Sequence, residues 1–213
     1  MDRPPVFADR TDAGRRLADA LGGLAEVPVV AGIPRGGIVV AAEVAAALGA
    51  PLRAVVARKV GAPGHPELAL GAVGPDGVAV LDRDLVARVG ATDRFVDQAV
   101  EEARAQVEAR LRSLPGVLRA GDAAGRTVIV VDDGVATGAT AAAVGRWLAT
   151  TGATRRVLAL PVGPADTVAR LGDEYDEVVT LLRPPAMGFY AVGPWYRDFR
   201  QVSDDEVAAL LAG

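Results

Sequence analysis

The fold is decided by the stretch Val128-Ile129-Val130-Val131-Asp132-Asp133-Gly134-Val135-Ala136-Thr137-Gly138-Ala139-Thr140. Its first four residues are all β-branched, which predicts a strand buried on both faces. Two carboxylates follow where that strand should end, and then a turn of small residues leads into an alanine-rich run at 141–148 that predicts a helix. Because a helix N-terminus offers free N–H groups and a positive dipole end, we expect the turn to bind an anion, phosphate above all.

The two acids specify the anion further. A carboxylate pair beside a phosphate is repulsive unless the ligand needs it, and Asp132 and Asp133 could accept hydrogen bonds from sugar hydroxyls or face a metal bound to the ligand. A phosphate next to a vicinal diol describes a ribose 5-phosphate. The alternative, a buried strand that ends in a solvated acidic cap, explains the Asp-Asp pair alone but not the whole pattern, in which threonines add hydroxyl donors and glycines admit a close backbone.

These residues resemble the phosphoribosyl diphosphate (PRPP) motif of the type I phosphoribosyltransferases. Neither alternative phosphate motif, Gly-x-x-x-x-Gly-Lys-Ser/Thr or Gly-x-Gly-x-x-Gly, occurs in the chain. The resemblance implies an α/β fold with a parallel twisted sheet flanked by helices, a helical insertion and a C-terminal hood. It also implies which motif residues bind PRPP: Asp132, Asp133, Gly134, Ala136, Thr137, Gly138, Ala139 and Thr140.

Composition sets outer limits on the function. The chain has 213 residues, enough for a single compact domain with a substantial core. Its net charge of −4 argues against a nucleic-acid partner held by a broad basic surface. With no cysteine and one histidine, disulfides, thiolate sites and His-rich metal clusters are excluded. The N-terminus has no apolar signal region and no apolar run approaches membrane-spanning length, so we expect a cytoplasmic protein without a membrane partner.

A second strand–turn–helix unit precedes the motif. A strand is expected at 27–33, a helix at 38–48, and between them Arg35-Gly36-Gly37, in which arginine can hold phosphate oxygens bidentately. Alone, this sequence is more simply explained as a surface turn. It is similar to the diphosphate loop of the xanthine–guanine enzymes, which implies that Arg35, Gly36 and Gly37 bind the diphosphate of PRPP. Because family members often hold a cis peptide here, we expect one between Pro34 and Arg35.

The next strand, expected at 52–58, delivers Arg58 and Lys59 to the edge of the sheet where α/β proteins bind ligands. Solvated surface charge is the competing interpretation of this pair. The Gly- and Pro-rich segment that follows predicts a flexible loop over 59–77, and the resemblance implies that this loop closes over the site. His65 and Glu67 are the candidate lid residues.

The remainder divides into an insertion, the end of the core and a hood. Helices are expected within 82–114, with charged residues including Arg110 on a solvated face. Another helix is expected at 7–22, and Arg10 lies mostly on its polar side. The core is expected to extend over 1–182, and the hood and terminal helix over 183–213. Hood aromatics suit a flat heterocycle, which makes candidates of Phe189, Trp195 and Tyr196, although such rings also pack against cores.

The resemblance implies transfer of the phosphoribosyl group of PRPP to a nitrogenous base in nucleotide salvage or related metabolism, with release of diphosphate. It implies Mg²⁺ held mainly by PRPP with help from Asp132 and Asp133, and a homodimer. Arg35 and Lys59 would neutralise the leaving diphosphate and the acids would favour positive charge at the anomeric carbon. The 6-oxopurine enzymes carry an acid where this chain has Ala136, which places those purines below other acceptors. Two alternatives stay open: a non-catalytic PRPP- or nucleotide-binding regulator, and another sugar-phosphate enzyme.

Overall fold

A five-stranded parallel sheet forms the centre of the computed structural model, which describes residues 5–22, 26–112 and 114–213. Its strands, in spatial order, are β2 (Leu52–Ala54), β1 (Val29–Gly32), β6 (Thr127–Val131), β7 (Arg155–Val162) and β8 (Glu177–Leu182). Every neighbouring pair runs parallel, with Val30 opposite Ile129 and Ile129 opposite Val157. Parallel strands bring their C-terminal ends to one edge, which is where the motif acids lie.

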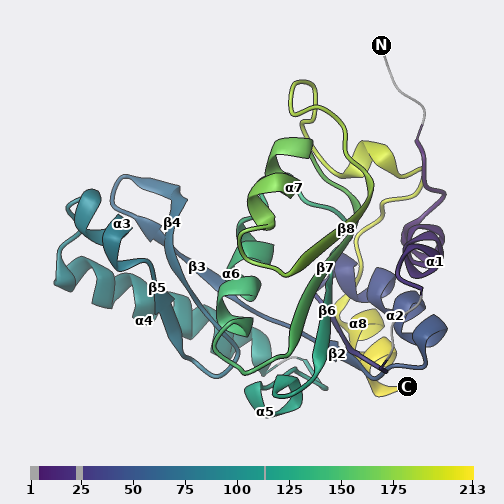
Figure 1. The fold of residues 1–213 in the computed structure, drawn as a ribbon, viewed down its shortest axis with the longest axis horizontal. Helices are drawn as coiled ribbons and strands as arrows, with labels where there is room; N and C mark the ends of the chain where they lie inside the picture. The colour runs from purple at the N-terminus through teal and green to yellow at the C-terminus, as the bar shows by residue number, and fades with distance from the viewer. Residues whose placement is uncertain (1–4, 23–25, 113) are drawn as a thin grey trace.

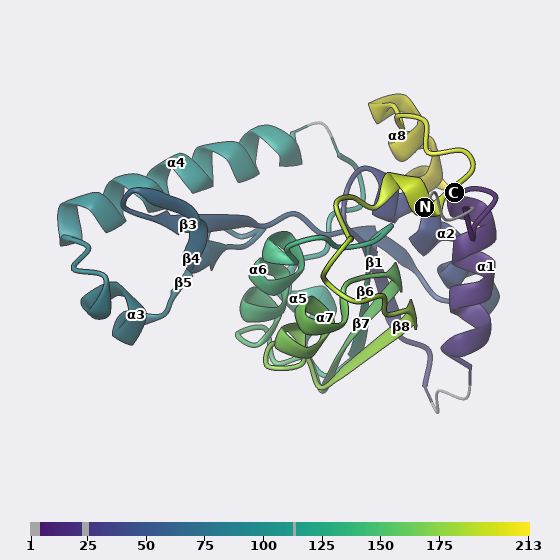
Figure 2. The same ribbon diagram turned by 90° about the horizontal axis from the view of Figure 1, so that it is seen from above.

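Helices cover both faces of this sheet, as Figures 1 and 2 show. The pleat alternates within β6: Val128 and Val130 pack toward α6 (Ala139–Leu148), while Ile129 and Val131 pack toward α1 (Arg10–Ala20) and α2 (Gly36–Leu48). Completing the layers are α7 (Ala165–Leu171) beside α6, the short α5 (Ala120–Ala123) and α8 (Asp204–Ala212) against α2. The predicted α/β architecture is confirmed.

A second lobe projects from one side of the core (Figure 2). It consists of an antiparallel sheet with the order β3 (Arg58–Ala62), β4 (His65–Val73) and β5 (Ala79–Leu81), followed by α3 (Arg83–Arg88) and α4 (Asp93–Leu111). The helices of this insertion match the expectation. Core and lobe join at Trp147 of α6, which is fully buried and donates its indole N–H to Asp76 at 2.9 Å.

The flexible loop expected over 59–77 is wrong as a description of the backbone. β3 and β4 pair antiparallel through most of it, with Ala62 opposite His65 and Arg58 opposite Val73. The dense Gly and Pro content reflects the turn, because Pro63 and Gly64 occupy the two central positions of the hairpin and Gly64 has φ +70°. The strand expected at 52–58 is divided between the two sheets: β2 ends at Ala54, and the chain enters the second sheet at Arg58.

The C-terminal segment returns to the core. A 3-10 turn at Gly193–Trp195 is followed by Tyr196, which bridges to Phe7 near the N-terminus, and residues 197–203 then run along α1 toward α8. Ser203 and Glu206 form a capping box at the start of α8, the terminal helix expected within 183–213. In the part of the chain that the structure describes, no helix is both long and apolar enough to cross a membrane.

Candidate active site

A cavity of about 340 Å³ opens at the C-terminal ends of β1 and β6, and we name it the acid cavity. Its floor is formed by the turn after β1 and by the two acids after β6. Five further segments supply its sides: the start of α1, the stretch from β2 to β3, the end of α4, the first turn of α6 and the C-terminal segment. The lining residues are Arg10, Ile33, Pro34, Arg35, Gly36, Val55, Val56, Ala57, Arg58, Arg110, Asp132, Asp133, Thr140 and Phe199.

The two predicted loops are packed against one another on the cavity floor. A Cβ atom on Gly36 would lie 1.8 Å from Oδ2 of Asp133, and one on Gly37 would lie 2.8 Å from the carbonyl oxygen of Val131. Both glycines are therefore required by close approach, with no room for a side chain. The Pro34–Arg35 peptide is cis, as expected, and Arg35 is exposed at the rim. The Arg35 loop and the acid pair form one structure.

The acid pair is largely withdrawn from water. Oδ1 of Asp132 accepts a hydrogen bond from the Asp133 amide at 2.9 Å, and Oδ2 of Asp133 pairs with Nε of Arg10 at 2.7 Å. Burial, and then the neighbouring Asp133 charge, raise the pKa of Asp132 well above its usual value. Burial also raises the pKa of Asp133, against which the Arg10 guanidinium acts by hydrogen bond and by charge. Arg10 therefore stabilises an ionised carboxylate in an environment that disfavours one.

The turn that follows the acids has the geometry of an anion site. Gly134 and Gly138 both take positive φ angles, +147° and +73°, and Gly138 is the N-cap of α6. Thr140 lines the acid cavity, so the first turn of this ten-residue helix reaches its wall. Ala136 is exposed, and its carbonyl oxygen accepts a hydrogen bond from Thr167 of α7 at 3.0 Å. The predicted phosphate turn therefore lies directly beside the acid pair.

The opposite wall holds two arginines that the sequence analysis did not place at the site. Arg10 and Arg110 were expected on solvated helix faces, but Arg10 is 9% exposed, and both line the acid cavity. Arg110 also pairs with Asp204 of α8 at 2.7 Å. Helical periodicity reports which side of a helix is polar and not which of its ends meets a cavity, so no signal in the sequence identified either residue.

The predicted cationic pair at 58–59 is divided between two hollows. Arg58 lines the acid cavity and also a neighbouring groove of about 440 Å³ between β3 and α4, whereas Lys59 lines that groove. The candidate lid residue His65 is exposed at the β3–β4 turn, and the Glu67 side chain lies outside the described residues. Lys59 and His65 therefore belong to the lobe that borders the acid cavity.

The hood aromatics form two groups. Tyr196 is 5% exposed, packs between Phe7 and Phe199 with ring centroids 5.2 Å and 5.0 Å away, and donates its hydroxyl to the carbonyl oxygen of Asp133 at 2.5 Å. It supports the acid turn and lacks the open ring face that stacking on a base requires. Phe189 and Trp195 stack on each other with centroids 5.9 Å apart and are partly exposed. Of the three candidates, only these two keep surface available to a ligand.

The carboxylates suit a metal that arrives with a ligand better than one held by the protein alone. Asp132 and Asp133 supply carboxylate oxygens of the kind that Mg²⁺ prefers. One oxygen of Asp133 is already paired with Arg10. Within the described ranges, no three His, Cys, Asp or Glu side chains converge as a metal-binding group. The donor atoms of the two carboxylates therefore fit Mg²⁺.

Comparison with known proteins identifies the class to which this fold and site belong. The family profile of the phosphoribosyl transferase domain matches residues 10–182. The chain therefore belongs to the phosphoribosyl transferase family, as its sequence motif indicated.

Particular relatives agree with this assignment. Two Mycobacterium tuberculosis proteins, one from each of two strains, carry the provisional name phosphoribosyl transferase and are 49% identical over 210 residues, 97% of this chain and 46% of theirs. The chain thus spans about half the length of those curated relatives. The crystal structure of TT1426 from Thermus thermophilus is 44% identical, covers 96% of this chain and 97% of its own, and superposes with a TM-score of 0.85.

Proposed function

We propose that this chain transfers the 5-phosphoribosyl group of PRPP to a nitrogenous base and releases diphosphate. The observation that carries the proposal is the contact between the two loops: Gly36 approaches Asp133 too closely for any side chain. A diphosphate at the Arg35 loop and ribose hydroxyls at the acids would therefore lie on adjacent parts of one small ligand. Family membership supports the use of PRPP in general, while the acceptor is inferred from this chain's own residues.

Each part of the cavity has a distinct task in this reaction. The 5-phosphate would bind the turn that leads into α6, where backbone amides and Thr140 donate. Asp132 and Asp133 would accept hydrogen bonds from the ribose hydroxyls and favour the positive charge that builds at the anomeric carbon as the diphosphate leaves. Arg35 and Arg58 would neutralise the diphosphate, joined by Lys59 from the adjacent groove. When bound, Mg²⁺ would supply further charge neutralisation on the diphosphate oxygens.

Ala136 and the hood narrow the acceptor. Because position 136 carries a methyl group and is exposed, it offers no carboxylate to a 6-oxopurine, and we rank hypoxanthine, guanine and xanthine below other bases. Phe189 and Trp195 are the rings that could border a flat heterocycle. We place the reaction in nucleotide salvage or related metabolism, in a cytoplasmic homodimer.

The test is diphosphate release from PRPP and Mg²⁺ over a panel of nucleobases. The unaltered chain should release diphosphate with at least one base, and Asp133→Asn should reduce release at least about a hundredfold. The matched control is Asp166→Asn, which removes a carboxylate from the exposed start of α7. Equal turnover by Asp133→Asn and the control would refute the assignment of the site, and brisk turnover of guanine would refute the acceptor ranking.

One observation favours a regulatory alternative. Arg10 already neutralises one carboxylate oxygen of Asp133. The same arrangement would suit a protein that binds a sugar phosphate and catalyses no reaction. Calorimetric binding of PRPP to the unaltered chain, with no diphosphate released in the presence of any base, would select this alternative. Binding of other sugar phosphates but not of PRPP would point to a different sugar-phosphate enzyme.

A further inference from the structure

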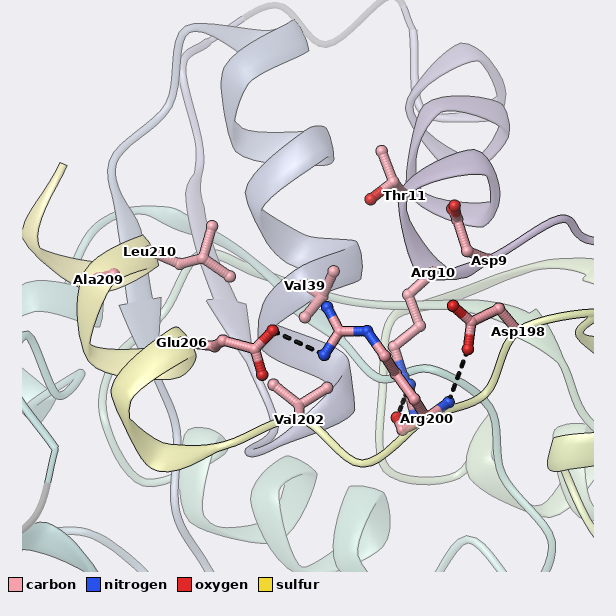
Figure 3. Close-up of a pocket in the computed structure, with 10 residues that line it drawn as sticks. All are labelled: Asp9, Arg10, Thr11, Val39, Asp198, Arg200, Val202, Glu206, Ala209 and Leu210. Carbon is pink, nitrogen blue, oxygen red and sulfur yellow. Dashed lines mark hydrogen bonds and ion pairs between the residues drawn. The ribbon is translucent and has the colours of Figure 1, made fainter.

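Arg10 links the acid cavity to a second hollow of similar size. That second cavity, about 360 Å³, lies between α1, α2 and α8, and Figure 3 shows Arg10 on its wall among residues of the C-terminal segment. Arg10 is the first residue of α1 and its side chain is 10% exposed. An arginine buried to this extent needs its donors satisfied, and its contacts reveal how it is held.

The guanidinium of Arg10 is fixed on two edges and one face. Nε pairs with Oδ2 of Asp133 at 2.7 Å, and Nη1 donates to the carbonyl oxygen of Arg200 at 2.9 Å. Its central carbon lies 3.9 Å from the centre of the Phe199 ring, an arrangement typical of a cation–π contact. A planar fork held at three points has little rotational freedom, so the direction in which it presents Nε to Asp133 is set.

The carbonyl group that anchors Nη1 is itself held in place. The amide of Arg200 donates to Asp198 at 3.0 Å, and the Arg200 side chain pairs with Glu206 of α8 at 2.7 Å. Both contacts are drawn in Figure 3. The C-terminal segment therefore forms a frame around Arg10, running from α8 through Arg200 to the acid pair. The backbone carbonyl oxygen of Asp133 also accepts a hydrogen bond from the Tyr196 hydroxyl at 2.5 Å.

We propose that Arg10 is a positioning residue for the phosphoribosyl transfer. It pairs with one carboxylate oxygen of Asp133 and thereby fixes the plane of that carboxylate, so that the other oxygen is oriented to accept a hydrogen bond from the ribose. The proposal rests on the proposed function. In this proposal α1 and the C-terminal frame contribute to the reaction, although both lie outside the two phosphate-binding loops. Arg10 itself contacts no ligand atom in this scheme and acts through Asp133.

The expected result separates orientation from affinity. Binding of PRPP depends chiefly on the phosphate turn and the Arg35 loop, whereas orientation of Asp133 matters most as charge develops in the transition state. Arg10→Lys keeps the charge, but one ammonium group cannot reproduce the fork that contacts Asp133 and Arg200 together. We expect its kcat to fall about tenfold with KM for PRPP within about twofold of the unaltered value. Arg10→Gln should lose about a hundredfold in kcat.

The experiment measures kcat, KM for PRPP, calorimetric PRPP affinity and melting temperature for both variants. The matched control is Arg15→Gln on the same helix, where the guanidinium pairs with Glu43 and its side chain is 70% exposed. Unchanged PRPP affinity, a selective loss of kcat and a smaller loss in Arg10→Lys than in Arg10→Gln support the proposal. Values of kcat per folded molecule equal to that of the control would overturn it.

The remaining outcomes are also decisive. If neither Arg10 variant folds, the contact is structural and the positioning proposal is wrong. If KM rises in parallel with the fall in kcat/KM while kcat is unchanged, Arg10 serves binding and the proposal is again wrong. If the unaltered chain neither binds PRPP nor releases diphosphate, the proposed function is wrong and the positioning role is wrong with it. If the unaltered chain is active and the Arg10 variants are equally active, only the positioning role is wrong.

Discussion

The acid cavity has two walls that are built in different ways. One wall, which includes the floor described above, is made of backbone: the turns after β1 and β6 meet at Gly36 with no space for a Cβ atom. The other is made of long side chains, with Arg10 from α1, Arg58 from β3 and Arg110 from α4 reaching in from separate elements. The backbone wall is fixed by local steric constraints, whereas the arginine wall depends on how distant elements pack. Substitutions on the first should therefore cost more activity than those of Arg58 and Arg110 on the second, whereas Arg10 acts through Asp133 of the first wall.

The largest expected effect lies in the backbone wall at Asp132. Asp132→Asn should reduce diphosphate release by about a thousandfold and also stabilise the fold. Burial and the Asp133 charge raise the pKa of Asp132, so its contribution to stability is present at low pH and is lost as pH rises through the raised value. An amide does not ionise and can still accept the Asp133 N–H.

Thermal unfolding at pH 4 and pH 8 would test this second part. We expect the variant to gain on the order of 1 kcal/mol at pH 8 and less at pH 4. A variant that is less stable than the unaltered chain at pH 8 would contradict the argument that burial of an ionised Asp132 is costly.

Gly36→Ala should have the next largest effect. Its Cβ would fall 1.8 Å from Oδ2 of Asp133 and 2.6 Å from Nε of Arg10, so the loop or the acid must move. A shift of that size in a reacting geometry costs about a hundredfold in kcat. The control is Gly121→Ala in α5, where a Cβ would meet nothing within 4 Å. Steady-state kinetics that leave the two variants alike would show that the close packing is not needed for turnover.

The contrast between the walls also explains what could be predicted from the sequence. The buried strand, the acids, the phosphate turn and the Arg-Gly-Gly loop are contiguous patterns, and β6, α6 and the cis Pro34–Arg35 bond are found where they were expected. Local sterics and backbone hydrogen bonding determine such features, so a short segment contains most of the information needed to infer them.

The arginine wall could not be predicted in the same way. Arg10 and Arg110 occupy polar helix faces, and only the packing of α1 against α2 and of α4 against β3 brings them to the cavity. The hairpin at Arg58–Val73 was missed because Pro63 and Gly64 were interpreted as signs of a loop and not as the two central residues of a turn. Tyr196 was grouped with the base-binding candidates Phe189 and Trp195, since its burial depends on a contact with Phe7 at the opposite end of the chain.

A smaller effect is expected in the arginine wall at Arg110. Arg110→Gln removes one of several positive charges facing the expected diphosphate, so we expect KM for PRPP to rise about tenfold with little change in kcat. Asp204→Asn is the matched control, because it removes a carboxylate that pairs with Arg110 and keeps the positive charge of Arg110 in the cavity. A fall in kcat as large as that of Gly36→Ala would erase the difference between the two walls.

The smallest effect is expected where the lobe that carries Arg110 is held together away from the cavity. Arg104 of α4 donates from Nε to the carbonyl oxygen of Gly77 at 2.8 Å and pairs with Glu101. Because that ion pair is exposed, the hydrogen bond to the β4–β5 turn dominates, and Arg104→Gln should lower the free energy of unfolding by about 1 kcal/mol. Arg94→Gln, an equal change of charge at an exposed position of the same helix, is the control for denaturant unfolding.

Neither variant should alter kcat, since neither residue lines the acid cavity. If Arg104→Gln instead raised KM for PRPP as Arg110→Gln does, the lobe would act on the cavity as a unit, and the arginine wall would depend on the whole lobe and not on single side chains.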